Sequence, residues 1–299
     1  MSAPAKLAAF AVVLAVLFGV GAVAGGATDP SGDEPRSERA GAGSMTEGAH
    51  GGAAKEDAMS TASHTGERQA HPVRGLAVAE NGMRIELATP ELRRGATEQL
   101  RFRIVDERGR AVRAFDVEHE RRMHLIVARR DLTGFQHLHP KMNTDGEWST
   151  EVRLDDAGSY RMFADFSAGD ETTTLASDLR VDGAADLRPL PRPKTTAVSD
   201  GGYDVRLAAP VARHGEEAEL RFTVTKDGRP VDTEPYLGAG GHLVALREGD
   251  LAFLHVHPTE HGDGIGFEAT FPTTGAYRLF LQFQVDGEIQ TVAFTQEVA

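Results

Sequence analysis

Cysteine is absent from the 299 residues of this chain. The protein therefore has no disulfide, no thiolate metal site, no cysteine nucleophile and no lipid-modified N-terminal cysteine. Basic charge is also in short supply, because 32 lysine and arginine residues stand against 45 acidic residues, which gives a net charge of −13. Nucleic acid repels a chain with this balance, so we expect no nucleic-acid partner.

Long hydrophobic runs are missing except for one at the N-terminus. Residues 7–24 are apolar or glycine, and no charge occurs between Lys6 and Asp29. A run of this length suits a membrane-spanning helix, whereas the A-x-A sequence at 22–24 leaves a cleaved signal peptide open. We predict that residues 1–28 form a transmembrane anchor or signal peptide. The rest then lies outside the cytoplasm, held at the cell membrane by one span, or secreted after cleavage.

The segment 29–72 has almost no aliphatic residue larger than alanine, and it is rich in glycine, serine, threonine and charge. Such a composition cannot bury enough surface to fold, so it predicts a disordered tether. The tether carries potential ligands for a transient metal ion, namely Met45, His50, Met59, His64 and His71. An ordinary linker with incidental histidines is the alternative interpretation.

From residue 73 onward the pattern indicates an all-β protein. Turn signals such as Asn81-Gly82 and Asp227-Gly228 recur between short apolar runs. Residues 100–104 and 220–224 alternate between apolar and polar side chains, as half-buried strands do.

The all-β region is an internal repeat. Residues 123–140 align without a gap with residues 241–258, and seven of the eighteen positions are identical. We predict two tandem immunoglobulin-like β-sandwich domains, 73–183 and 196–299, joined by a stiff proline-rich linker at 184–195. Tyr160 and Tyr277 occupy equivalent positions after a glycine and resemble the tyrosine corner of sandwich folds.

Three histidines recur in each repeat with the spacing H-x12-H-x-H. They are His124, His137 and His139 in the first repeat and His242, His255 and His257 in the second. The two histidines of an H-x-H segment point to the same face of a strand. A hairpin centred on Gly249-Asp250 would place His242 opposite His257, and the same register would place His124 opposite His139. We therefore predict one three-histidine metal site in each repeat, locally similar to the zinc site of carbonic anhydrase.

Copper or zinc is the predicted cofactor, because imidazole suits Zn(II), Cu(II) and Ni(II). The second repeat has no methionine, whereas the first has Met123, Met142 and Met162, which leaves Cu(I) open there. Further candidate ligands are Asp165, Gln282 and His261, which we interpret as surface or loop residues.

Each of these side chains also has a purely structural interpretation. The strand 124–127 is apolar on both faces, so the histidines could be hydrogen-bonded core residues that brace the hairpin. The recurring aromatic pairs are interpreted as core, namely Phe135/Phe253, Phe163/Phe280 and Phe166/Phe283.

The N-terminal segment, the tether and the segment Met123-His-Leu…Phe-Gln-His-Leu-His-Pro140 together resemble bacterial envelope proteins of the YtkA-like and CopC-like kind. That resemblance implies an immunoglobulin-like fold and extracytoplasmic copper handling. We predict a membrane-tethered, non-enzymatic metal-binding protein for metal handling or delivery, whose partners are the membrane and an envelope metalloprotein. Two alternatives remain open, a structural or interaction module without metal, and a zinc hydratase or hydrolase. The sequence lacks G-x-S-x-G, P-loop and H-E-x-x-H motifs and any repeated acid pair, which disfavours the enzyme.

Overall fold

A computed structural model describes residues 73–169, 171–209, 211–254, 256–259 and 263–299. These residues form strands, turns and loops, with no helix among them, so the all-β prediction is confirmed. Within the described part of the chain, no helix could cross a membrane. The predicted anchor (1–28) and tether (29–72) lie outside the described residues, as do His255 and His261.

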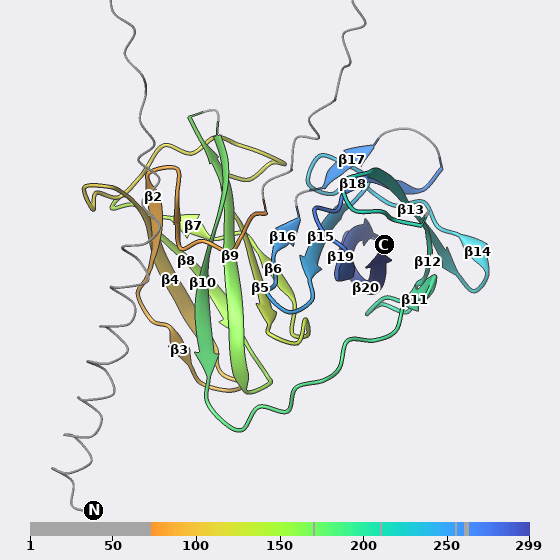
Figure 1. The fold of residues 1–299 in the computed structure, drawn as a ribbon, viewed down its shortest axis with the longest axis horizontal. Coiled ribbons are helices and arrows are strands. Elements are labelled where there is room, and N and C mark those ends of the chain that lie inside the picture. The colour runs from red at the N-terminus through yellow and green to blue at the C-terminus, as the bar shows by residue number, and fades with distance from the viewer. Residues whose placement is uncertain (1–72, 170, 210, 255, 260–262) are drawn as a thin grey trace, which may run out of the picture. The chain divides into compact units, whose positions relative to one another are not determined.

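The first repeat consists of two five-stranded sheets that pack face to face (Figure 1). One sheet contains, in spatial order, β1 (Ala79–Glu80), β2 (Met83–Leu87), β4 (Thr97–Asp106), β8 (Glu147–Arg153) and β7 (Lys141–Met142). The other contains β3 (Glu91–Leu92), β10 (Glu171–Val181), β9 (Gly158–Ala168), β5 (His124–Arg129) and β6 (Gln136–Leu138). All neighbouring strands are antiparallel except β3 and β10.

The second repeat follows the same plan. Its first sheet contains β11 (Thr196–Val198), β12 (Asp204–Ala208), β13 (Glu217–Lys226), β18 (Ile265–Thr270) and β17 (His257–Thr259), with β14 (Arg229–Pro230) paired to β13. Its second sheet contains β16 (Phe253–Leu254), β15 (His242–Arg247), β19 (Gly275–Val285) and β20 (Glu288–Val298). Both repeats lie in one compact unit of the chain.

Alternation along the strands builds a separate core inside each sandwich. In β4, Leu100, Phe102 and Ile104 are buried while Arg101 and Arg103 are exposed. The equivalent strand β13 buries Leu220, Phe222 and Val224 in the same way. Successive side chains of a strand point to opposite faces. In the sheets that contain β4 and β13, one face therefore lies in solvent and the other faces the core.

Both predicted tyrosine corners are present. The Tyr160 hydroxyl donates to the backbone oxygen of Asp156 over 2.8 Å, and the Tyr277 hydroxyl donates to that of Thr273 over 3.2 Å. Each tyrosine is almost fully buried, so its hydroxyl needs a partner, and the carbonyl four residues upstream provides one.

A third apolar cluster joins the two sandwiches, and it explains why strand 124–127 is apolar on both faces. We call it the inter-repeat cluster. It contains residues from equivalent positions of the two repeats, namely Ile126 and Val244, Ala128 and Leu246, the turn residues Leu132 and Leu251, Phe135 and Phe253, Phe163 and Phe280, and Ala176 and Ala293. Leu190 of the linker packs against it. Each repeat thus presents the same patch to the other, as the two subunits of a twofold dimer do.

The prediction that the six recurring aromatic residues are core is confirmed, since five are buried and Phe135 packs partly buried against the inter-repeat cluster, and four of the six lie in this cluster rather than inside a sandwich. The rings of Phe135 and Phe280 stack with centroids 4.1 Å apart, and those of Phe163 and Phe253 lie 5.7 Å apart. Only Phe166 and Phe283 belong to the internal cores. The exchange of partners between equivalent positions is the signature of pseudo-twofold packing.

The segment before β1 also crosses to the second repeat. The Arg74 carbonyl accepts the Phe253 amide over 3.0 Å, an antiparallel bridge between the repeats. Gly75 follows with φ of 69°, and a Cβ there would lie 2.7 Å from the Cβ of Phe253 and 2.8 Å from the Phe163 ring. Only glycine fits this position, because both the backbone conformation and the close approach exclude a side chain.

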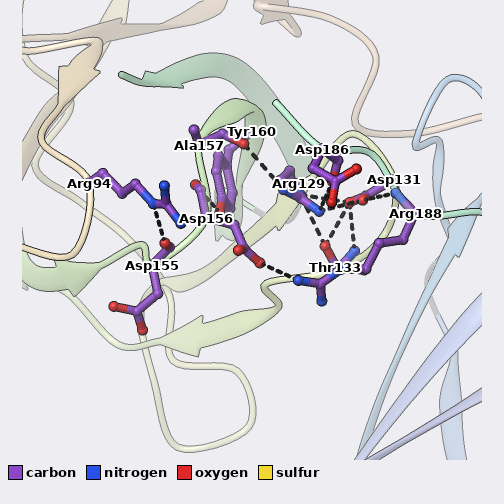
Figure 2. Close-up of polar contacts among 10 residues, drawn as sticks. All are labelled: Arg94, Arg129, Asp131, Thr133, Asp155, Asp156, Ala157, Tyr160, Asp186 and Arg188. Carbon is purple, nitrogen blue, oxygen red and sulfur yellow. Dashed lines mark hydrogen bonds and ion pairs between the residues drawn. The ribbon is translucent and has the colours of Figure 1, made fainter. Parts of the chain in front are cut away.

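The linker docks onto the first repeat through a buried ion pair. Arg129 is 1% exposed and holds Asp131 with two hydrogen bonds of 2.9 and 2.6 Å (Figure 2). Arg129 also donates to the backbone oxygen of Asp186, and the Arg188 amide donates to Asp131 over 2.8 Å. Burial opposes ionisation of Asp131, but hydrogen bonds from Arg129, the Arg188 amide and Thr133 outweigh it and lower the pKa to about 2.

We expect Asp131→Asn to destabilise the protein by roughly 3–5 kcal/mol, because it leaves the buried Arg129 guanidinium without its counter-charge. Urea unfolding at neutral pH measures the effect. The matched control is Asp250→Asn, which breaks the equivalent pair of Arg247, where the carboxylate side chain is 40% exposed. Solvent screens that pair, so about 1 kcal/mol or less is expected. Equal losses in the two variants would contradict the prediction.

Candidate metal centre

The histidines of the first repeat converge as the predicted register requires. Strand β6 pairs with β5 so that Leu138 lies opposite Leu125 and His137 opposite Ile126. Continuing this register puts His139 opposite His124, and their ring centroids are 5.2 Å apart. The ring centroids of His137 and His139 lie 4.7 Å apart. Both rings are on one face of β6, whereas Leu138 points to the opposite face and packs against the internal core.

The second repeat departs from the prediction after Leu254. The predicted hairpin register holds for Leu246 with Phe253 and for Ala245 with Leu254. The chain then crosses to the other sheet, where His257 lies in β17 opposite Glu268 of β18 and is exposed. His257 therefore does not face His242, and the predicted second triad does not form on one hairpin.

His242 instead joins the histidines of the first repeat. Its ring stacks on His124 with centroids 5.4 Å apart and on His137 at 4.7 Å. His124, His137 and His242 each offer a ring nitrogen, and these nitrogens all lie within 4.8 Å of one another. A single histidine cluster thus lies between the repeats. It adjoins the apolar inter-repeat cluster, because strands β5 and β15 contribute residues to both clusters.

Two outer hydrogen bonds orient the rings of His124 and His137. His124 Nε2 lies 3.2 Å from the backbone oxygen of Glu118, which can only accept, so Nε2 carries the hydrogen. His137 Nδ1 lies 2.7 Å from Gln282 Oε1 and likewise donates. Gln282 is oriented in turn by Thr291, to which its Nε2 donates over 3.2 Å. Such partners are the usual support of metal-binding imidazoles.

The other ring nitrogens of His124 and His137 face each other inside the cluster. His124 Nδ1 and His137 Nε2 are 3.0 Å apart, and each bears a lone pair when both rings are neutral and carry their hydrogens on the outer nitrogens. A cation between them relieves this repulsion. With metal–nitrogen bonds of about 2.0–2.1 Å, that separation corresponds to a ligand angle of roughly 90–100°. The donor set therefore fits a divalent ion that imidazole prefers.

Burial keeps the histidine cluster neutral. Burial is the main reason that the pKa of His137 is lowered to about 3 and the pKa of His139 to about 4, and the neighbouring His124 lowers both further. Burial also lowers the pKa of His124 and moves that of His242 well below its ordinary value. Neutral imidazole is the form that a metal ion binds.

We expect the metal-free protein to lose stability as pH falls from about 6.5 towards 4. In the unfolded chain the histidine pKa is about 6.5, so the unfolded state binds more protons than the folded state in this window. The loss of stability begins near pH 6.5 and continues until the folded-state pKa values are reached, at about 4 for His139 and about 3 for His137. Urea midpoints across this range measure the slope. His137→Gln should flatten it, and an unchanged slope in that variant would count against the prediction.

Asp165 and Gln282 are not surface or loop residues, contrary to the sequence interpretation. In the strand register Asp165 lies opposite His124 and Gln282 lies opposite His242. Thr174 donates to Asp165 over 2.6 Å, as Thr291 accepts from Gln282 at the equivalent position. Burial raises the pKa of Asp165, while Thr174 and His124 act against it.

Methionine sulfur lies on the wrong face for this cluster. Met123 and Met162 belong to the internal core of the first repeat, with Leu125 and Ala164. The strands alternate, so His124 and Asp165 point to the opposite face. Met142 is a partly buried residue packed against the same core. The structure therefore gives no support to the Cu(I) option that the three methionines left open.

A small cavity opens beside His124 and His242. Its volume is about 20 Å³, and its polar lining also includes Glu118, His119 and Asp165. His119 was not among the predicted site residues, because it lacks a counterpart in the second repeat, where Leu237 holds the equivalent turn position. The sequence analysis also did not predict that the histidine cluster lies between the repeats. The sequence signal for this location was that strand 124–127 is apolar on both faces.

These features define a tandem β-sandwich protein with a buried histidine cluster between its repeats. The chain belongs to the family described as Domain of unknown function (DUF8832), whose model matches residues 77–183 and 196–299.

No curated protein matches the chain in sequence. Among solved structures, the Escherichia coli adhesin FdeC is similar at 17% identity and a TM-score of 0.27, covering 75% of this chain and 66% of that one. A Salmonella alpha-2-macroglobulin is similar at 13% identity and a TM-score of 0.27, covering 77% of this chain and 15% of that one. A chimeric titin Z1Z2 is similar at 15% identity and a TM-score of 0.21, covering 72% and 96%. The chain spans less than two thirds of the first two proteins, and similarity this low carries no functional information.

Proposed function

We propose that this protein binds one divalent metal ion between its two repeats, through His124, His137 and His242, and handles or delivers that ion outside the cytoplasm. The observation that carries the proposal is the convergence of three imidazoles, in which His124 Nδ1 and His137 Nε2 face each other over 3.0 Å beside His242. Neutral buried imidazoles placed this way gain from a cation and lose from its absence.

Zinc(II) and copper(II) are the ions that the donor set favours. Imidazole nitrogen suits both, whereas Cu(I) prefers the thioether ligands that lie in the core of the first repeat. His139 supports the same interpretation, because its Nε2 is buried and has no hydrogen-bond partner among the described residues. A buried polar atom without a partner is costly unless something binds to it.

Binding is favoured over catalysis by the size of the cavity. A volume of about 20 Å³ beside the histidines has room for roughly one or two water-sized groups, which is too little for an organic substrate. Asp165 lines the same cavity and could act as an acid or base, but the cavity leaves its carboxyl no room for an organic substrate on that side. We therefore propose a non-enzymatic role.

We further propose that each repeat is an immunoglobulin-like sandwich. Two facing antiparallel sheets and a tyrosine corner in each repeat support this fold. The alternative function, an envelope interaction module without metal, draws support from the extensive inter-repeat packing, which would position the histidines even if they only braced the interface.

Metal titration of the purified protein separates the two functions. Zinc(II) and copper(II) are added in turn, and the metal retained after gel filtration is counted per chain. We expect one equivalent at neutral pH, and none in the triple variant of His124, His137 and His242 to alanine. The control variant His257→Ala should keep the full equivalent. No retained metal in the wild type would overturn metal binding and favour the interaction module.

A further inference from the structure

The cavity reaches the histidine cluster at two of its members. His124 and His242 line it, whereas His137 and His139 are not among its lining residues. An ion that enters from the cavity meets His119 there, since this partly exposed side chain also lines it.

His119 is close enough to complete a four-ligand site. Its ring centroid lies 6.2 Å from that of His124 and 6.0 Å from that of His242. Rings bound to one tetrahedral ion through bonds of about 2.0 Å have centroids roughly 5 Å apart. The His119 ring needs to move by roughly 1 Å to bind, which a side-chain rotation provides.

The backbone that carries His119 is unusual. Glu118 and Arg121 exchange backbone hydrogen bonds of 2.8 and 2.9 Å, which leaves His119 (φ 45°) and Glu120 (φ 64°) as a two-residue turn. Both residues have positive φ, a conformation that favours glycine and asparagine.

The second repeat builds the equivalent turn in the ordinary way. There Leu237 has φ 54° and is followed by Gly238, while Tyr236 and Ala239 exchange the backbone hydrogen bonds. In the first repeat the turn retains two side chains at strained positions, and strain of this kind collects at functional sites. The base of the turn is fixed, because the Glu118 carboxylate accepts from Ser167 and its carbonyl accepts from His124.

We infer that His119 is the fourth, exchangeable ligand of the proposed metal site, the one that water or an acceptor displaces when the ion enters and leaves through the cavity. This inference rests on the proposed function. It assigns the first repeat a ligand that the second cannot supply, since leucine occupies the equivalent position.

The test follows the release of zinc from the loaded, full-length protein into excess chelator. His119→Asn removes the imidazole and keeps the turn, because asparagine adopts positive φ readily. We expect this variant to retain one zinc per chain and to release it at least about tenfold faster, and we expect added imidazole to slow the release again. His257→Ala, the matched control, removes an exposed histidine in the other sheet of the second repeat and should release zinc at the wild-type rate.

Release from His119→Asn at the wild-type rate overturns the role of His119 and leaves the metal site standing. A third variant, His139→Ala, tests the competing fourth ligand: faster release from it, with the wild-type rate in His119→Asn, also overturns the role of His119. If the wild-type protein retains no zinc in the metal titration, the proposed metal site itself is overturned.

Discussion

Replacing His242 with alanine is expected to abolish metal retention, although the other two ligands, His124 and His137, belong to the other repeat. Two imidazoles hold a divalent ion far more weakly than three, so we expect affinity to fall at least about 100-fold, or about 2.7 kcal/mol. Metal at about 100 times the dissociation constant stabilises a binding protein by roughly 2.7 kcal/mol, and that stabilisation should disappear in the variant. Isothermal titration and thermal unfolding with and without zinc measure both effects.

The control for this prediction is His257→Ala. His257 is exposed in β17 and lies in the other sheet of the second repeat. It should leave the affinity and the zinc-dependent rise in melting temperature unchanged. If His257→Ala removed one of two retained ions while His242→Ala removed the other, the site would not be shared between repeats in the way the structure indicates.

Phe280→Ala is expected to destabilise the protein by about 3–5 kcal/mol, because it removes a large buried side chain from the inter-repeat cluster. The Phe280 ring is 4% exposed and stacks on Phe135 of the other repeat. Loss of this contact should uncouple the repeats, so that urea unfolding shows two transitions instead of one. It should also weaken zinc binding, since Phe280 lies opposite Val244 in the strand pair that positions His242.

Phe283→Ala provides the matched control. Phe283 is fully buried in the internal core of the second repeat and has no place in the inter-repeat cluster. We expect a comparable loss of stability, without separation of the two repeats before the second repeat itself unfolds. A Phe280→Ala variant that loses less than about 1 kcal/mol would show that the interface contributes little to the fold.

The sequence by itself determined the strands, the repeat and the local register. Alternation in residues 100–104 and 220–224 identifies half-buried strands, since side chains of a strand alternate in direction. The register of the β15–β16 hairpin follows from Gly249-Asp250, because turn geometry sets which residues lie opposite. Tyr160 and Tyr277 were identified by their position relative to glycine, a local signal.

The tertiary structure alone decided where the histidines meet. Local spacing predicted one triad in each repeat, but after Leu254 the chain leaves the β15–β16 hairpin and carries His257 to another sheet. His242 then completes a cluster with the other repeat, through packing between residues more than 100 positions apart. Period-two patterning shows that a strand is apolar on both faces, but it carries no information about what covers the second face. Only the docking of two equivalent patches supplies that, because apolar burial is non-directional and any complementary surface satisfies it.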